Sequence, residues 1–204
     1  MISQNNLLIL GAGQYGVMAA EIADAMGVFG RIAFLDDSFS PRHCERSEAI
    51  SGNTSHPEQR EGSSQISLIG AFADLPKFAG EFRYGFVAIC NTALRRKLTE
   101  QLQYNCITPA ILVHPKAYVS SSAQLQKGCC VEPNATVQAG AVVATSSFIA
   151  SGAVVRHDAF VGEFCHVDCN AVVESLAVVP AETHIACGSV FCKEQGIGVP
   201  GHNV

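Results

Sequence analysis

The sequence contains no tryptophan, few basic residues and no long apolar segment. Lysine and arginine together number 13 in 204 residues, against 18 acidic residues, and the formal net charge is −5. No basic stripe of the kind that binds nucleic acid is visible. No apolar run approaches the roughly 20 residues that a membrane helix needs, and no charged-then-apolar signal peptide opens the chain. We therefore expect a cytoplasmic protein that neither binds nucleic acid nor spans a membrane.

The nine cysteines do not form the motifs that are typical of zinc sites or disulfide-rich domains. Their number is odd, and no CxxC pair occurs. Cys129 and Cys165 stand where the repeat described below requires a small residue, and Cys169 and Cys187 lie eighteen residues apart, as stacked neighbours would. We expect reduced thiols with a mainly structural role.

What the sequence does contain is a branched aliphatic residue at every sixth position over a long segment. Four residues after each aliphatic comes a small residue, either Ala, Cys, Ser or Thr. The thirteen aliphatic positions are Val113, Val119, Leu125, Val131, Val137, Val143, Ile149, Val155, Val161, Val167, Val173, Val179 and Ile185.

A period of six fits neither a helix nor a simple strand, and it predicts a parallel β-helix with one short flat side per repeat. Three sides make a triangular coil of eighteen residues, so the thirteen repeats give a little over four coils. Each buried aliphatic contributes about 2 kcal/mol before entropy is counted, so the prism can form its own core. A rigid rod or an oligomerisation module is an alternative reading of the repeat alone.

The beginning of the chain reads as a strand, a glycine-rich turn and a helix. Residues 7–10 are LLIL, GAGQYG follows, residues 14–27 have helical apolar spacing, and residues 31–35 form a second strand before Asp36 and Asp37. This βαβ pattern fits an NAD fingerprint about as well as a nucleotide-sugar site. The domain is too short for both halves of a dinucleotide fold, which favours a nucleoside-diphosphate sugar; a purely structural use of the glycines stays open.

The rest of the first domain is interrupted by a polar segment. Residues 38–65 are rich in Ser, Glu, Arg and Pro, and we expect a flexible surface insertion. Beyond it we expect a short helix at 71–78, a buried strand at 84–90 and a helix at 92–104. The predicted boundary lies at residue 112, between an α/β domain at 1–112 and the repeat domain at 113–204.

Polar residues are few within the repeat but gather in one stretch, which contains Arg156, His157, Asp158, Glu163, His166 and Asp168. The nine-residue spacing predicts that His157 and His166 lie on neighbouring sides of the prism, and His184 should stack over His166. Zinc is a rival reading that the gaps of nine and eighteen disfavour. Asp158 can touch His157 only where the backbone turns a corner, since consecutive strand residues face opposite ways.

Several segments together resemble the sugar acyltransferases of the sialic acid O-acetyltransferase and UDP-bacillosamine N-acetyltransferase family. The most specific is VVRHDAFVGEFCHV at 154–167, and the others are FLDD at 34–37, LPKF at 75–78, AICNTALRRK at 88–97 and GVP at 198–200. The resemblance implies a Rossmann-like nucleotide-sugar-binding domain at 1–112 followed by a left-handed β-helix acyltransferase domain at 113–204, assembled as a homotrimer. It further implies transfer of acetyl from acetyl-CoA to an amino or hydroxyl group of a nucleotide-linked sugar for surface glycans, without a metal.

The resemblance also implies roles for individual residues. His157 would be the general base with Asp158 as its acidic partner, and His166 and Cys187 would contact acetyl-CoA. The residues that would hold the nucleotide-sugar are Gly11, Gly13, Gln14, Tyr15, Asp36, Asp37, Cys90 and Asn91.

Three departures from the family pattern leave an alternative open. Tyr15 stands where the family usually has His, Cys90 stands where it usually has Gly, and the repeat after His166 is about one coil shorter. The alternative is a non-catalytic trimer that binds a sugar nucleotide and has lost acyltransferase activity. For the trimer itself, we expect an apolar flank that includes Phe148 and Phe160 to be exposed on a single prism.

Overall fold

The computed structural model describes residues 5–38 and 66–193. The chain divides into two compact units, Met1–Ala110 and Ile111–Val204, and each unit is described by itself. The expected insertion at 38–65, apart from Ser38, and the GVP segment at 198–200 lie outside the described residues. Within the described part of the chain, no helix is long and apolar enough to cross a membrane.

The first unit is built on a five-stranded parallel sheet with the order β3-β2-β1-β4-β5. The strands are β1 (Leu7–Leu10), β2 (Ile32–Leu35), β3 (Ser67–Gly70), β4 (Tyr84–Val87) and β5 (Thr108–Pro109). Every residue of β1 and β2 is buried, as the unbroken apolar runs predict for strands covered on both faces. β4 ends at Val87, three residues before the predicted end, where the chain turns toward the next helix.

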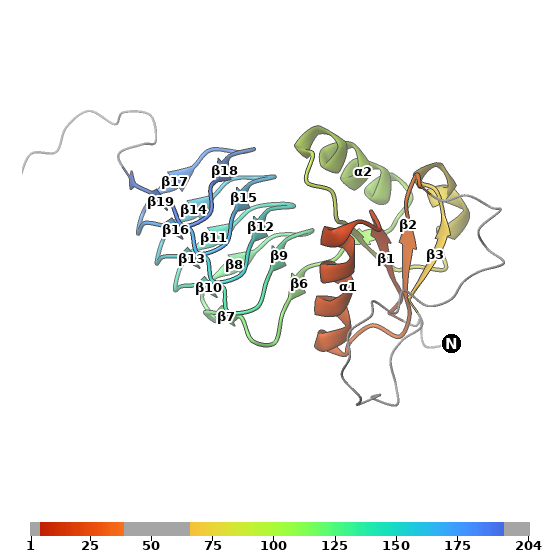
Figure 1. The fold of residues 1–204 in the computed structure, drawn as a ribbon, viewed down its shortest axis with the longest axis horizontal. Helices are drawn as coiled ribbons and strands as arrows, with labels where there is room; N and C mark the ends of the chain where they lie inside the picture. Colours follow the sequence, from red (N-terminus) through yellow and green to blue (C-terminus); the bar gives the residue numbers. More distant parts are fainter. Residues whose placement is uncertain (1–4, 39–65, 194–204) are drawn as a thin grey trace, which may run out of the picture. The chain divides into compact units, whose positions relative to one another are not determined.

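Among the described residues of this unit, the helices are two α-helices and one 3₁₀ helix (Figure 1). The helix α1 (Gln14–Met26) ends at Gly27, whose φ of 64° lies in the left-handed region that glycine adopts readily. The predicted short helix is the 3₁₀ helix η2 (Phe72–Phe78), which contains Pro76. The helix α2 (Thr92–Tyr104) begins after Asn91, whose side-chain oxygen accepts a hydrogen bond from the backbone of Leu94 at 2.9 Å.

The second unit is a parallel β-helix, as the six-residue period predicts, and it is left-handed, as the resemblance implies. Its two-residue strands form three parallel sheets, which we call the first, second and third sides (Figure 1). The first side contains β6 (Leu112–Val113), β9 (Cys130–Val131), β12 (Phe148–Ile149), β15 (His166–Val167) and β18 (His184–Ile185). The second contains β7 (Tyr118–Val119), β10 (Thr136–Val137), β13 (Val154–Val155), β16 (Val172–Val173) and β19 (Val190–Phe191). The third contains β8 (Gln124–Leu125), β11 (Val142–Val143), β14 (Phe160–Val161) and β17 (Val178–Val179).

The strand register confirms the eighteen-residue coil. Val137 pairs with Val155, and Val155 pairs with Val173 one coil further on. The ten aliphatics from Val131 to Ile185 are buried inside the prism, and the first three of the series pack against them with part of their surface exposed. The small residues of the repeat from Cys129 to Ala177 are buried beside them, Cys165 included, whereas Thr183 and Ser189 are half-buried. Burial raises the pKa of the Cys129 thiol to about 11, as expected for a cysteine that acts as a small apolar residue.

Each corner of the prism is a two-residue turn, and the second residue usually has a positive φ. Gly140, Asp158 and Leu176 occupy this position in successive coils at one corner, with φ of 69°, 58° and 61°. Glycine accepts this conformation freely and aspartate better than most residues, but leucine is strained there. The side chains at one turn position therefore form a column along the prism.

The expected exposed flank is only partly present. Phe148 has no exposed surface, so its predicted exposure was wrong, whereas Phe160 is 39 % exposed. Sequence periodicity places Phe148 outside the prism, but it does not reveal what else in the chain covers an outward side chain. The large apolar residues exposed on the described part of the β-helix are Tyr118, Phe160, Leu176, Val178 and Val190.

Candidate functional site

His157 and Asp158 form a contact at the corner between the second and third sides. They are the two turn residues between β13 and β14, and the turn brings consecutive side chains together. The imidazole Nδ1 lies 3.1 Å from Asp158 Oδ2. The side chains are 50 % and 58 % exposed, so both remain accessible from solvent. The sequence predicted that Asp158 contacts His157 only if the backbone turns a corner there, and the structure has this corner at residues 157–158.

The coils on either side hold this corner in place. The backbone N–H of His157 donates to Gln138 Oε1 at 3.1 Å, and the N–H of Asp158 donates to the carbonyl of Ala139 at 2.9 Å. In the next coil, the N–H of Leu176 donates to the carbonyl of His157 at 3.2 Å. Gly140 lies directly under Asp158, where a Cβ atom would stand only 2.2 Å from the carboxylate Oδ1. The corner thus has a fixed backbone and an exposed acid–base pair.

His166 and His184 stack on the first side, as their spacing predicts. They pair in register on β15 and β18, and their ring centroids are 5.4 Å apart. Phe148 approaches His166 from the preceding coil in an edge-to-face arrangement at 5.9 Å. His184 Nε2 lies 3.3 Å from Asp168 Oδ2. The pKa of Asp168 is lowered, mainly because the backbone N–H of Cys169 donates to it, with a smaller effect from the two imidazoles.

The predicted placement of His157 and His166 on neighbouring sides was wrong. His157 occupies the corner between the second and third sides, and His166 belongs to the first side, which is the side opposite that corner. The packed aliphatic core of the prism lies between them. One β-helix therefore does not bring the two imidazoles to a common ligand.

In the first unit, the residues expected to hold a nucleotide-sugar lie where parallel strands end. The glycine turn follows β1, Asp36 and Asp37 follow β2, and Cys90 and Asn91 follow β4. Because β1 lies between β2 and β4, these three connections meet at the carboxyl edge of the sheet. The chain runs from β1 outward to β2 and later returns to β4 on the other flank, and ligands of open α/β sheets bind at such a reversal of strand order.

Two of the glycines have a packing reason to be glycine, and one does not. A Cβ atom on Gly11, whose φ is 109°, would stand 2.8 Å from the carbonyl oxygen of Ala88, and one on Gly16 would stand 2.0 Å from that of Gly11. Gly13 is exposed, has a φ of −70° and has no atom within 4 Å of its would-be Cβ. The open space at Gly13 allows a ligand to approach the backbone, as phosphate groups do at helix N-termini.

The acidic and amide side chains at this edge also organise the loops. Asp36 accepts hydrogen bonds from the backbone N–H of Ala12 and of Ser38, both at 2.8 Å. Burial raises the pKa of Asp36, but these hydrogen bonds and one from the Ser38 side chain outweigh it, and the net pKa is lowered. Asp37 accepts from the N–H of Phe72 at 3.1 Å. Cys90 and Gln14 are exposed, and Tyr15 is half-buried.

Sequence reasoning did not identify Gly140, Gln138 or Asp168 as supports of the site. The eighteen-residue coil could have identified two of them, because Gly140 and Gln138 stand one coil before Asp158 and Arg156. Among the residues that the structure describes, no group of three or more His, Cys, Asp or Glu side chains is arranged to hold a metal ion.

Comparison with known proteins supports an α/β first unit of the PglD type and a β-helical second unit. Residues 6–102 match the PglD N-terminal domain family. The acetyltransferase domain of PglB from Neisseria gonorrhoeae is 26 % identical, with a TM-score of 0.71 over 93 % of this chain and 92 % of that one. The chain is thus similar to PglD-like acetyltransferases, in its first unit through the family match and over most of its length through the fold.

Further solved structures share this fold. The same PglB domain in complex with acetyl coenzyme A is similar with a TM-score of 0.68, covering 93 % of this chain and 91 % of that chain. PerB from Caulobacter crescentus, in complex with CoA and GDP-perosamine, is 19 % identical with a TM-score of 0.67, covering 92 % of this chain and 89 % of that one. At that identity the likeness to PerB concerns the fold. No curated protein sequence matches the chain.

Proposed function

We propose that this chain is a PglD-like acetyltransferase that transfers the acetyl group of acetyl-CoA to an amino group of a nucleotide-linked sugar, with a hydroxyl group as the second possible acceptor. The observation that carries the proposal is the His157–Asp158 pair on a hexapeptide β-helix that follows a nucleotide-binding type of α/β unit. The complexes of related proteins with acetyl coenzyme A and with GDP-perosamine support the two substrate classes. Such a reaction serves the synthesis of surface glycans.

The geometry at His157 suits a general base. When Nδ1–H donates to Asp158, the tautomer is fixed and Nε2 carries the lone pair. Nε2 takes the proton from the sugar amine as the nitrogen attacks the thioester carbonyl, and the thiolate of CoA then leaves. A positioned base of this kind accelerates transfer by roughly 10² to 10⁴. Asp158 places a negative charge beside the imidazolium that forms.

The positions of the two histidines support a homotrimer with sites between subunits. If His157 is the base and His166 contacts acetyl-CoA, both must reach one thioester, and in a single prism they face opposite ways. A site that uses both is therefore completed by a second copy. Exposed apolar residues on the second and third sides give the prism surface to bury, with Tyr118 61 % and Val178 58 % exposed.

In the first unit, the nucleotide-sugar is assigned to the carboxyl edge of the sheet. Gly13 and Gln14 form the N-terminus of α1, where backbone N–H groups favour a phosphate. Cys90 and Asn91 face the same edge from the connection after β4, while Asp36 and Asp37 hold the turn and the start of η2. Cys187 is exposed one coil beyond Cys169 and is assigned with His166 to acetyl-CoA.

The decisive experiment is acetyl transfer to a panel of UDP-, dTDP- and GDP-linked amino sugars, followed by mass spectrometry of the sugar. Direct detection of the product is preferable to a thiol reagent, because Cys90, Cys106 and Cys187 are exposed and react with it. We expect one nucleotide-sugar to be acetylated. If a nucleotide-sugar binds but none is acetylated, the chain is the non-catalytic sugar-nucleotide-binding trimer instead, and if none binds, the proposed substrate class is wrong.

Replacing the base tests the mechanism within the active protein. His157→Ala is expected to lower kcat by roughly 10² to 10⁴ while leaving nucleotide-sugar affinity nearly unchanged. His166→Ala is expected to raise the KM for acetyl-CoA instead, and His184→Ala is the matched control for its stacked position. Near-normal turnover of the His157→Ala protein would exclude this residue as the base.

A further inference from the structure

Two cysteines occupy the same turn position in consecutive coils of the β-helix. Cys169 follows β15 and Cys187 follows β18, and the strands on both sides of the turns pair in register. The backbone N–H of Gly188 donates to the carbonyl of Cys169 at 2.9 Å. The Cα atoms of the two cysteines are thus separated by about the 4.8 Å of paired strands, within the roughly 4.4–6.8 Å that a disulfide spans.

We propose that Cys169 and Cys187 form a dithiol site that small-molecule disulfides convert into a disulfide between two coils. This is the only pair among the nine cysteines that is eighteen residues apart. Cys187 is exposed and Cys169 is half-buried, whereas Cys129, Cys130 and Cys165 are buried. Neither cysteine of the pair takes part in a disulfide in the structure.

The oxidation proceeds by two exchange steps that balance. The exposed Cys187 thiolate attacks the small disulfide, forms a mixed disulfide and releases one small thiolate, which takes up the proton that Cys187 lost. The Cys169 thiolate then attacks the Cys187 sulfur and displaces the second small thiolate, which takes up the proton of Cys169. One small disulfide is reduced to two thiols, and the two protein thiols become one disulfide.

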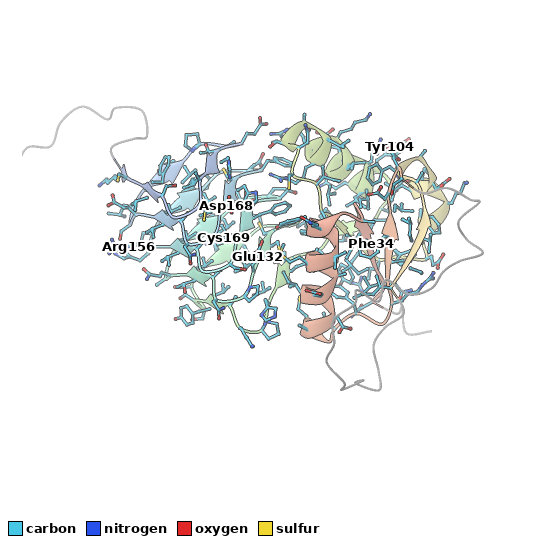
Figure 2. All side chains as sticks on the ribbon, in the orientation of Figure 1. Phe34, Tyr104, Glu132, Arg156, Asp168 and Cys169 are labelled. Atoms are coloured by element: carbon cyan, nitrogen blue, oxygen red, sulfur yellow. The ribbon has the colours of Figure 1, made fainter. Side chains whose placement is uncertain are left out.

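The surroundings of Cys169 control the rate of the second exchange step, because they determine how much of its thiol is ionised. Figure 2 shows Glu132, Asp168 and Cys169 gathered on one region of the β-helix. Burial raises the pKa of the Cys169 thiol, and the nearby carboxylates of Glu132 and Asp168 raise it further. Ring closure therefore becomes faster as the pH rises, because more of Cys169 is thiolate.

The disulfide would fasten the last coil of the described chain. Within residues 66–193, β18 pairs only with β15 and β19 only with β16, and the third side has no strand beyond β17. The Cys169 N–H donates to Asp168 Oδ1 at 2.7 Å, and Asp168 Oδ2 contacts His184. A covalent link at this turn therefore acts on His184 and, through it, on His166. An effect on acetyl-CoA rests on the proposed function, whereas formation of the disulfide does not.

The test treats the reduced full-length protein with oxidised glutathione and maps every cysteine by peptide mass spectrometry. We expect a Cys169–Cys187 disulfide without retained glutathione, forming faster at pH 9 than at pH 7. In Cys169→Ser the reaction should stop at a glutathione adduct on Cys187. In Cys187→Ser no cross-link forms. Cys90→Ser, which removes an exposed cysteine from the other unit, is the matched control and should leave the pair's reaction unchanged.

Three results would overturn the dithiol site. They are stable glutathione adducts on both cysteines, a disulfide from either one to Cys192 or to another copy of the chain, and an unreacted pair under conditions that modify Cys90. If the disulfide forms, a severalfold higher KM for acetyl-CoA that dithiothreitol reverses supports its link to the proposed site. A cross-link without this change would place the coenzyme elsewhere, and the mapping result decides the dithiol site even if no acetyl transfer is found.

Discussion

Gly140 offers a test of the His157–Asp158 pair that leaves both residues in place. Gly140 has a φ of 69° and lies one coil before Asp158, where a Cβ atom would stand 2.2 Å from Oδ1. In Gly140→Ala the carboxylate must rotate away from this methyl group. That movement takes Oδ2 away from the imidazole Nδ1, to which it now lies at 3.1 Å.

The expected effects follow from the backbone conformation and from the exposure of the pair. An alanine in the left-handed region costs about 1–2 kcal/mol of stability. The two side chains are 50 % and 58 % exposed, so solvent screens their attraction to about 1 kcal/mol or less. Losing about 1 kcal/mol in the transition state lowers kcat roughly fivefold. This is far smaller than the loss expected for His157→Ala.

Gly152→Ala is the matched control. Gly152 has a φ of 71°, and its would-be Cβ lies 2.3 Å from Asn170 Oδ1, at the corner between the first and second sides, which does not hold the His157–Asp158 pair. Denaturant unfolding should show equal losses of stability in the two variants, and steady-state kinetics should show a lower kcat only in Gly140→Ala. Equal losses of kcat in both would mean that activity follows stability. Normal kcat in Gly140→Ala would show that the carboxylate position does not matter.

Three further predictions concern other parts of the chain. Gly13→Ala should keep the melting temperature and weaken nucleotide-sugar binding, whereas Gly16→Ala should destabilise the first unit, because the new Cβ would stand 2.0 Å from a backbone oxygen. Scanning and titration calorimetry distinguish the two outcomes. Normal nucleotide-sugar binding by Gly13→Ala would exclude the glycine turn from the binding site. Leu176→Asn should relieve strain at a φ of 61° and raise the stability of the subunit by about 1 kcal/mol. Because Leu176 is an apolar side chain that is 51 % exposed, its loss should also weaken association in sedimentation experiments. Unchanged association would place Leu176 outside the interface. Because the pKa of Asp168 is lowered in the folded state, its carboxylate adds stability above pH 3.8, and this stability is lost as the pH falls through the lower folded pKa. Asp168→Asn should therefore reduce the free energy of unfolding at pH 7 but change it little at pH 2–3. Equal losses at both pH values would contradict the ionic role.

The β-helix could be predicted from the sequence almost completely, because each buried aliphatic reports its own position in the coil. The same rule, used fully, also places His157 and His166. His157 comes two residues after Val155, in a turn, while His166 comes one residue before Val167, in a strand. The prediction of neighbouring sides used only the nine-residue separation and overlooked this difference in phase.

The first unit was harder to derive because two of its strands carry a weak signal. β3 follows the polar segment at 38–65, and β5 has only two residues, one of them Pro109. These edge strands depend on pairing with β2 and β4 rather than on their own apolar pattern. Phe148 was misjudged for a related reason, since its burial depends on packing that periodicity does not encode.

The columns of stacked turn residues limit how the length of this chain can change. A single residue inserted at any corner would shift every later side chain by one position, so aliphatics would leave the core and Asp158 would no longer stand over Gly140. Adding or removing eighteen residues preserves every column. The β-helix can therefore grow or shrink only in whole coils, and a viable deletion within it would remove one complete turn of the prism while keeping His157 and its supporting coil together.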